Sequence, residues 1–70
     1  MTVPDNAEAK AANHQGATHH RQGRLAEAET CYRRALILCP EFPEALNNLG
    51  VLARSRGEFK TAEQHFRDAL

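Results

Sequence analysis

The stretch that decides the fold is residues 43–70, PEALNNLGVLARSRGEFKTAEQHFRDAL, because residues 9–36, AKAANHQGATHHRQGRLAEAETCYRRAL, are a second version of it. At a shift of 34 positions the identical pairs are Ala11 and Ala45, Asn13 and Asn47, Gly16 and Gly50, Gly23 and Gly57, Ala28 and Ala62, Glu29 and Glu63, Arg33 and Arg67, Ala35 and Ala69, and Leu36 and Leu70. A large apolar side chain also recurs where Leu25 aligns with Phe59 and Tyr32 with Phe66. Such a period predicts stacked repeats, each burying its apolar face against a neighbour.

The four glycines of the repeat predict two different structural roles. Gly16 and Gly50 fall inside predicted helices, where glycine costs about 1 kcal/mol relative to alanine, so we expect close approach of another helix there. Gly23 and Gly57 fall where a helix ends, and we expect a positive φ at both. None lies in a phosphate-binding motif.

Local signals predict four helices joined by short turns. The sequence Asp5-Asn6-Ala7-Glu8 has the form of a capping box, so the first helix is expected over 6–22. The second is expected over 25–39. A third begins at Pro43, which suits a first helical position, and ends before Gly57, and the fourth follows over 59–70. Turns of this length predict antiparallel helical hairpins.

Period and residue pattern together resemble the tetratricopeptide repeat (TPR), whose helices follow W-x2-L-G-x2-Y, then A-x3-F, then P. The second unit reads Leu46-x2-Leu49-Gly50-x2-Ala53 and Ala62-x3-Phe66, and the first reads Ala12-x2-Gln15-Gly16-x2-His19, Ala28-x3-Tyr32 and Pro40. The resemblance implies an all-α fold in which two helix-turn-helix units stack as a fragment of a right-handed superhelix. It divides the chain into a lead-in and helix cap (1–8), one unit (9–42) and a second unit (43–70) that stops before its expected end.

Composition agrees with one small helical domain. The chain has 70 residues, a formal net charge of zero and 26% charged residues, which gives no overall attraction to nucleic acid or to an anionic membrane. No apolar run approaches the roughly 20 residues that span a bilayer, and the N-terminus lacks the apolar core of a signal peptide. We therefore expect a cytoplasmic location, without membrane or nucleic-acid partners.

Histidine and cysteine raise the question of a metal or redox site. His14, His19 and His20 lie on one predicted helix but form no i, i+4 pair, so no metal site is expected, and His19 is expected to fill a half-buried position between helices. Cys31 and Cys39 are eight residues apart on another helix, about 12 Å along its axis, too far for a disulfide. We expect both to be small packing residues.

No catalytic arrangement is visible. Ser55 is the sole serine, and no nucleophile has an orienting partner in a known motif. We expect no enzyme activity within these residues and no cofactor. Two charge pairs in the favourable i, i+4 orientation, Glu29 with Arg33 and Glu63 with Arg67, predict a solvated convex surface.

The TPR resemblance implies a concave face, lined mainly by the first helix of each unit, that holds a peptide segment of a partner protein. The positions that line it are Lys10, Asn13, His14, Ala17, His20, Arg21, Glu44, Asn47, Asn48, Val51, Arg54 and Ser55. The basic residues among them outnumber Glu44, so the expected peptide is extended and neutral to acidic.

Two subclasses of the family bear on the asparagines. Asn47-Asn48-Leu49-Gly50 looks like the repeats of O-linked N-acetylglucosamine transferases and related bacterial proteins, whose asparagine ladder holds a peptide backbone. His14 interrupts such a ladder in the first unit. The dicarboxylate clamp that binds chaperone tails is disfavoured, since it would want lysine at Asn13 and asparagine at Ala17. Solvated asparagines without a ligand remain the alternative.

The leading hypothesis is therefore a protein-interaction module that is part of a longer scaffold protein. Leu70 aligns with Leu36, after which the first unit continues to Pro40, so the chain looks cut. Alternatives are the N-terminal repeats of a larger enzyme such as a glycosyltransferase, and a small metal or redox protein. A weak homodimer is also expected, through an apolar face comprising Leu49, Leu52, Phe59 and Phe66.

Overall fold

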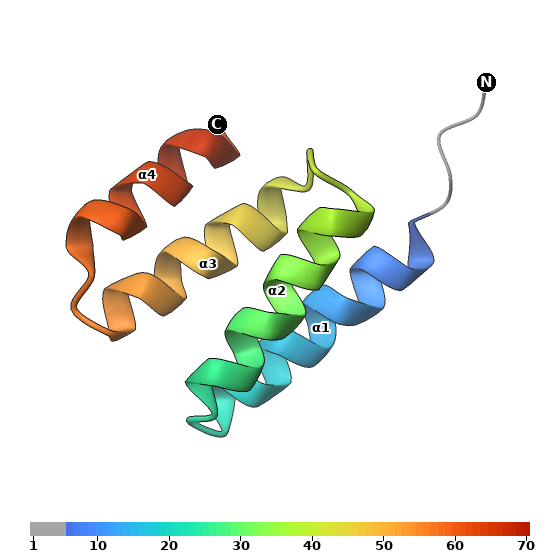
Figure 1. The fold of residues 1–70 in the computed structure, drawn as a ribbon, viewed down its shortest axis with the longest axis horizontal. Helices are drawn as coiled ribbons and strands as arrows, with labels where there is room; N and C mark the ends of the chain where they lie inside the picture. The colour runs from blue at the N-terminus through green and yellow to red at the C-terminus, as the bar shows by residue number, and fades with distance from the viewer. Residues whose placement is uncertain (1–5) are drawn as a thin grey trace.

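The computed structural model describes residues 6–70, which form four helices. They are α1 (Ala7–Arg21), α2 (Leu25–Leu38), α3 (Pro43–Ser55) and α4 (Phe59–Ala69). Figure 1 shows α1 with α2 and α3 with α4 as two antiparallel hairpins, and α3 packs against both helices of the first hairpin. The all-α class is confirmed, and the observed helix ends lie within one or two residues of the predicted ones.

The first helix begins one residue later than predicted. Asn6 is its N-cap, with φ 52° and ψ 27° in the left-handed region that asparagine tolerates better than most residues. The Asn6 side chain makes no capping bond to α1, and its Nδ2 instead donates to Cys39 Sγ at 3.6 Å. Asp5, the other residue of the predicted capping box, lies outside the described residues.

Each hairpin turn depends on a glycine with positive φ, as predicted. Gly23 has φ 77° and Gly57 has φ 78°. At the end of α1, the backbone N–H groups of Gly23 and Arg24 donate to the His20 and His19 carbonyls, at 3.0 and 2.9 Å. These bonds satisfy carbonyls that the end of α1 would otherwise leave unpaired.

The predicted close approach at the other two glycines is made by an aromatic ring. A Cβ on Gly16 would lie 2.6 Å from ring carbons of Tyr32, and one on Gly50 would lie 2.6 Å from a ring carbon of Phe66. In each hairpin the second helix therefore lays its aromatic side chain across the glycine of the first. This contact explains why the glycine and the aromatic recur together.

The apolar core lies between the first hairpin and α3. One cluster joins Ala28 and Tyr32 of α2 to Leu49 and Leu52 of α3. A second, smaller cluster joins Ala12, Ala35 and Ala45. Both clusters cross from one hairpin to the other, so the two hairpins share one core.

The predicted exposure of Leu49 and Leu52 is wrong. Their exposed fractions are 3% and 2%, because α3 is the helix that packs on the first hairpin and directs these leucines toward it. The open apolar surface of the second hairpin consists instead of Phe59, which is 67% exposed, the fully exposed Leu70 and the half-buried Phe66. Homodimer formation stays a prediction, confined to this smaller surface.

Candidate peptide-binding face

The predicted groove residues lie on α1 and α3, the two helices that contact each other across the hairpins. All but one are at least partly accessible. Exposed are Lys10, His14, Arg21, Glu44, Asn47, Arg54 and Ser55, half-buried are Ala17, His20, Asn48 and Val51, and buried is Asn13. The structure thus offers a largely polar, accessible stripe on each helix.

Asn13 and Asn48 form a hydrogen bond across the seam between α1 and α3. Asn48 Nδ2 donates to Asn13 Oδ1 at 2.9 Å, and Asn13 is only 9% exposed. A carboxamide has two N–H donors and an oxygen acceptor, so Asn48 keeps one donor and its oxygen after this bond. Asn13 therefore fixes the orientation of the Asn48 carboxamide by accepting this hydrogen bond, a contact that the repeat alignment did not indicate.

A second polar contact joins the helices near their C-terminal ends. His20 Nε2 lies 3.3 Å from Ser55 Oγ, and Ser55 Oγ in turn donates to the Val51 carbonyl at 3.0 Å. Because the serine hydrogen is directed to that carbonyl, the serine oxygen accepts from His20, which places a proton on Nε2. Two side-chain hydrogen bonds thus join α1 to α3.

Lys10, Arg21 and Arg54 on this face are exposed, and their contacts leave their charge available. Arg54 places its guanidinium carbon 5.9 Å from the centre of the Phe66 ring, and Arg21 Nη2 donates to Thr18 Oγ1 at 3.4 Å. Within residues 6–70, the recorded ion pairs involve neither of these arginines nor Lys10. Positive charge therefore outweighs Glu44 on this face.

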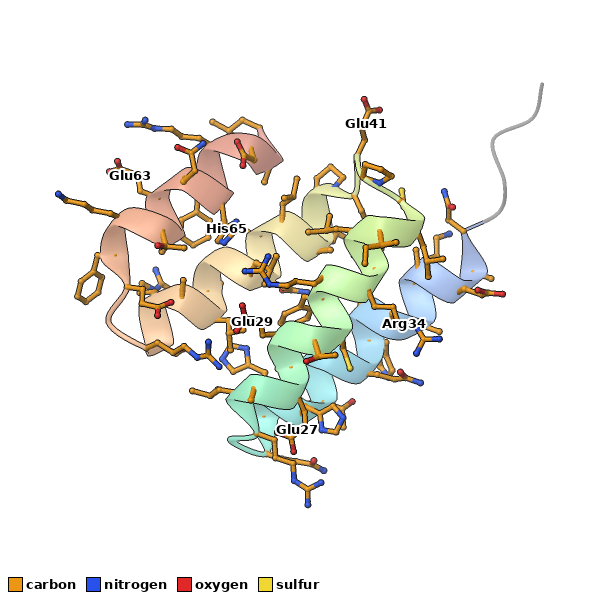
Figure 2. All side chains as sticks on the ribbon, in the orientation of Figure 1. Glu27, Glu29, Arg34, Glu41, Glu63 and His65 are labelled. Atoms are coloured by element: carbon orange, nitrogen blue, oxygen red, sulfur yellow. The ribbon has the colours of Figure 1, made fainter. Side chains whose placement is uncertain are left out.

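The ion pairs lie on α2, α4 and the end of α3. The predicted pairs are confirmed, with Glu29 to Arg33 at 2.9 Å and Glu63 to Arg67 at 3.2 Å. Sequence reasoning missed a third contact, in which Arg56 Nη1 donates to Glu29 Oε1 at 2.6 Å and joins the hairpins. Hydrogen bonds from Arg33 and Arg56 lower the pKa of the Glu29 carboxyl. Figure 2 shows Glu29 between the hairpins and Glu63 on the outer side of α4.

The residues weighed for metal or redox chemistry occupy ordinary packing positions. His19 is half-buried, as predicted, and its Nδ1 is buried without a partner. Cys31 and Cys39 are half-buried free thiols, consistent with the packing role predicted for them. Over the described range 6–70, no three His, Cys, Asp or Glu side chains gather in a metal-binding group.

None of the helices between residues 6 and 70 combines the length and hydropathy needed to cross a membrane.

The chain matches a known repeat family over almost all of its described length. The profile of the tetratricopeptide repeat matches residues 7–70. The chain is also similar to the cell division cycle protein 16 homologs of Homo sapiens and Mus musculus, at 46% identity over 43 residues in each case. That segment is 61% of this chain but 7% of either relative, so the chain spans a small part of their length.

The fold, the glycine and aromatic contacts and the profile match agree with one another. Repeats of this family generally serve as non-catalytic protein–protein interaction modules. The two hairpins described above are of this kind, and the chain belongs to the tetratricopeptide repeat family.

Proposed function

We propose that this protein binds an extended, neutral to acidic peptide segment of a partner protein along the face formed by α1 and α3. The observation that carries the proposal is the Asn13–Asn48 bond, which holds a part-buried carboxamide at the seam between the two helices. The donor and acceptor left on Asn48 match the alternating N–H and C=O groups of an extended backbone.

Electrostatics supports the charge of the proposed peptide. Lys10, Arg21 and Arg54 are exposed on the two helices that form the face, and His14 and His20 add basic character. An acidic side chain of the peptide would gain from these cations, whereas a basic peptide would be repelled. The charges are expected to select the partner and its register more than to raise affinity.

Affinity is expected to be weak because the face is short. It is built from α1 and α3, of 15 and 13 residues, and stable protein complexes bury roughly 1,200 to 2,000 Å² in total. A peptide on two helices contributes less than this area. We therefore expect rapid exchange of the peptide.

The test is a selection from a displayed library of random decapeptides against the protein and, separately, against the double variant Asn48→Ala, Arg54→Ala. Peptides recovered with the native protein should be rich in Asp and Glu, poor in Lys and Arg, and should lose binding to the double variant. The Gln64→Ala variant, which removes an exposed carboxamide from α4, is the matched control and should bind as the native protein does. Peptides that bind the double variant equally well would place the binding surface elsewhere.

A further inference from the structure

Thr61 stands at a position that is acidic in the first hairpin. At the shift of 34 residues it aligns with Glu27, and both are the third residue of the second helix of their hairpin. The first turns of α1, α2 and α3 each contain an acidic residue, namely Glu8, Glu27 and Glu44, whereas the first turn of α4 contains none. The second hairpin therefore has a hydroxyl group where the first has a negative charge.

The hydroxyl of Thr61 is accessible to another protein. Residues 54–61 are all exposed, and they form the longest exposed run between residues 6 and 70. The hydroxyls of Thr18, Thr30 and Ser55 each donate to the carbonyl four residues earlier, at 3.0 to 3.2 Å. Thr61 lies too near the start of α4 for that bond, because the residue four positions earlier, Gly57, precedes the helix. Its hydroxyl is therefore open to reaction.

Thr61 also lines a narrow cleft between the hairpins, together with three basic side chains. These are Arg33 of α2, Arg56 at the C-cap of α3 and His65 of α4. Figure 2 shows His65 and Glu29 in this region, from α4 and α2 respectively. The free volume of the cleft is about 20 Å³, enough for one water molecule, so a larger group attached to Thr61 would stay at the exposed rim.

Both arginines of the cleft keep N–H donors for a second acceptor. Arg33 donates from Nε and Nη2 to one oxygen of Glu29, and Arg56 donates from Nη1 to the other, whereas a guanidinium has five N–H groups. The Arg33 and Arg56 side chains are 58% and 29% exposed, so their remaining donors face the rim. Glu58 is the other carboxylate that lines the cleft, and because it is exposed, solvent screens its repulsion of a further anion.

We propose that Thr61 is a phosphorylation site and that its phosphate accepts hydrogen bonds from Arg33 and Arg56, which ties α4 to the first hairpin. A phosphate on threonine carries about −1.5 to −2 charges at pH 7 and three strong acceptor oxygens, and it orders structure at a helix N-terminus opposite arginines. Within residues 6–70, α2 and α4 do not pack against each other. The phosphate therefore adds a link between two helices that otherwise lack one.

The reaction is a phosphoryl transfer catalysed by a protein kinase. Thr61 Oγ1 attacks the γ-phosphorus of a nucleoside triphosphate and forms the new P–O bond. The bond from that phosphorus to the oxygen bridging it to the β-phosphate breaks, and a nucleoside diphosphate leaves. The hydroxyl proton passes to the catalytic base of the kinase.

The first experiment identifies the acceptor residue. The protein is incubated with a lysate of its source cells and a nucleoside triphosphate radiolabelled at the γ-phosphorus, and peptide mapping locates the label. We expect label on Thr61, and we expect it to be lost in the variant Thr61→Val. The variant Thr30→Val removes another exposed threonine and should leave the labelling unchanged. Label only on the other hydroxyl residues, or no label, would overturn the proposal.

The second experiment locates the phosphate. A chain of 70 residues can be made by chemical synthesis with phosphothreonine at Thr61. This phosphate should raise the midpoint of thermal unfolding by about 4 °C or more. Most of that gain should vanish in the double variant Arg33→Gln, Arg56→Gln, with each phosphorylated protein compared with its own unphosphorylated form. The variant Arg34→Gln removes an exposed arginine of α2 that does not line the cleft, and should keep the gain.

Phosphorus NMR gives a readout that does not depend on stability. The arginines favour the doubly charged phosphate, so the second pKa of the phosphate should be lower in the folded protein than in the same protein unfolded in urea. Circular dichroism of every variant establishes that the helices are intact.

Two further outcomes would contradict the link to the arginines. One is a gain in thermal midpoint that persists in the double variant, which would assign the effect to the dipole of α4 alone. The other is a phosphate pKa that is the same in the folded and the unfolded protein. The decapeptide selection does not bear on either result, because Thr61, Arg33 and Arg56 all lie outside the proposed peptide-binding face.

Discussion

Arg56 Nη1 donates a hydrogen bond of 2.6 Å to Glu29 Oε1 and so links the end of α3 to the N-terminal half of α2. The other carboxylate oxygen of Glu29 accepts from Arg33 at 2.9 Å. Each of Glu29 and Arg56 is 29% exposed, whereas the Glu63–Arg67 pair is more than 65% exposed on both sides. Glu29 and Glu63 align in the repeat, but only Glu29 joins one hairpin to the other.

The first prediction concerns the stability that this connection contributes. Glu29→Gln should lower the free energy of unfolding by about 0.5 to 1 kcal/mol, because it weakens two charge-assisted bonds in a partly buried place. Glu63→Gln should change it by less than about 0.3 kcal/mol, because exposed i, i+4 pairs contribute little. Urea denaturation measures both. Equal losses in the two variants would contradict the assignment of Glu29 as an inter-hairpin contact.

The free energy of unfolding should depend on pH in part through the titration of the Glu29 carboxyl group. The two arginines lower its pKa from the ordinary value of 4.5. A carboxyl group with a lowered folded-state pKa stabilises the fold above its unfolded pKa, and this contribution is lost as the pH falls through the folded-state value. The stability difference between the native protein and Glu29→Gln should therefore be constant near neutral pH and shrink below about pH 4.5. A difference that grew on acidification would contradict this sign.

Breaking the hydrogen bond between Asn13 and Asn48 should destabilise the protein, and the effects of substituting the two residues should not be additive. Asn13→Ala leaves a part-buried donor of Asn48 without its partner, so we expect a loss of about 1 to 3 kcal/mol. In the double variant Asn13→Ala, Asn48→Ala that donor is absent, and the loss should be smaller than the sum of the single losses by about 0.5 kcal/mol or more. Thermal denaturation of the four proteins gives the coupling directly. Strict additivity would mean that the bond does not form in solution.

The two mid-helix glycines should respond differently to alanine. Gly16→Ala places a Cβ 2.6 Å from the fully buried ring of Tyr32 and should destabilise the protein by about 1 to 3 kcal/mol, despite the higher helix propensity of alanine. Gly50→Ala faces the half-buried Phe66, which has open space beyond it, so its effect should be smaller. Thermal denaturation ranks the two variants. A stabilised Gly16→Ala protein would show that Tyr32 moves aside freely.

The sequence was sufficient for features whose cause lies within one hairpin. Gly23 and Gly57 end helices by their own conformational freedom, and the pairs Glu29–Arg33 and Glu63–Arg67 follow from helical spacing. The repeat also revealed which residues are equivalent in the two hairpins. Residues that are equivalent in the repeat are expected to form the same local structure, and the four helices lie at the predicted positions.

Contacts between hairpins could not be predicted in the same way. Leu49 and Leu52 were expected at an open surface, because repeat alignment does not state which neighbour α3 packs against. Arg56 reaches Glu29, and Asn48 reaches Asn13, through a displacement of one hairpin relative to the other that no spacing within a hairpin encodes. The repeat pattern predicts Asn48 as a groove residue, whereas its hydrogen bond to the buried Asn13 follows only from the three-dimensional arrangement.

The ring that crosses Gly16 also gives this protein a built-in optical reporter. Tyr32 is the sole tyrosine, the chain has no tryptophan, and its ring lies in the cluster that joins α2 to α3. Burial raises the pKa of the Tyr32 phenol above its ordinary value of 10.0. Tyrosine absorbance and fluorescence of the unlabelled protein therefore originate at the junction of the two hairpins, and phenolate formation should require a higher pH in the folded protein than in the unfolded one.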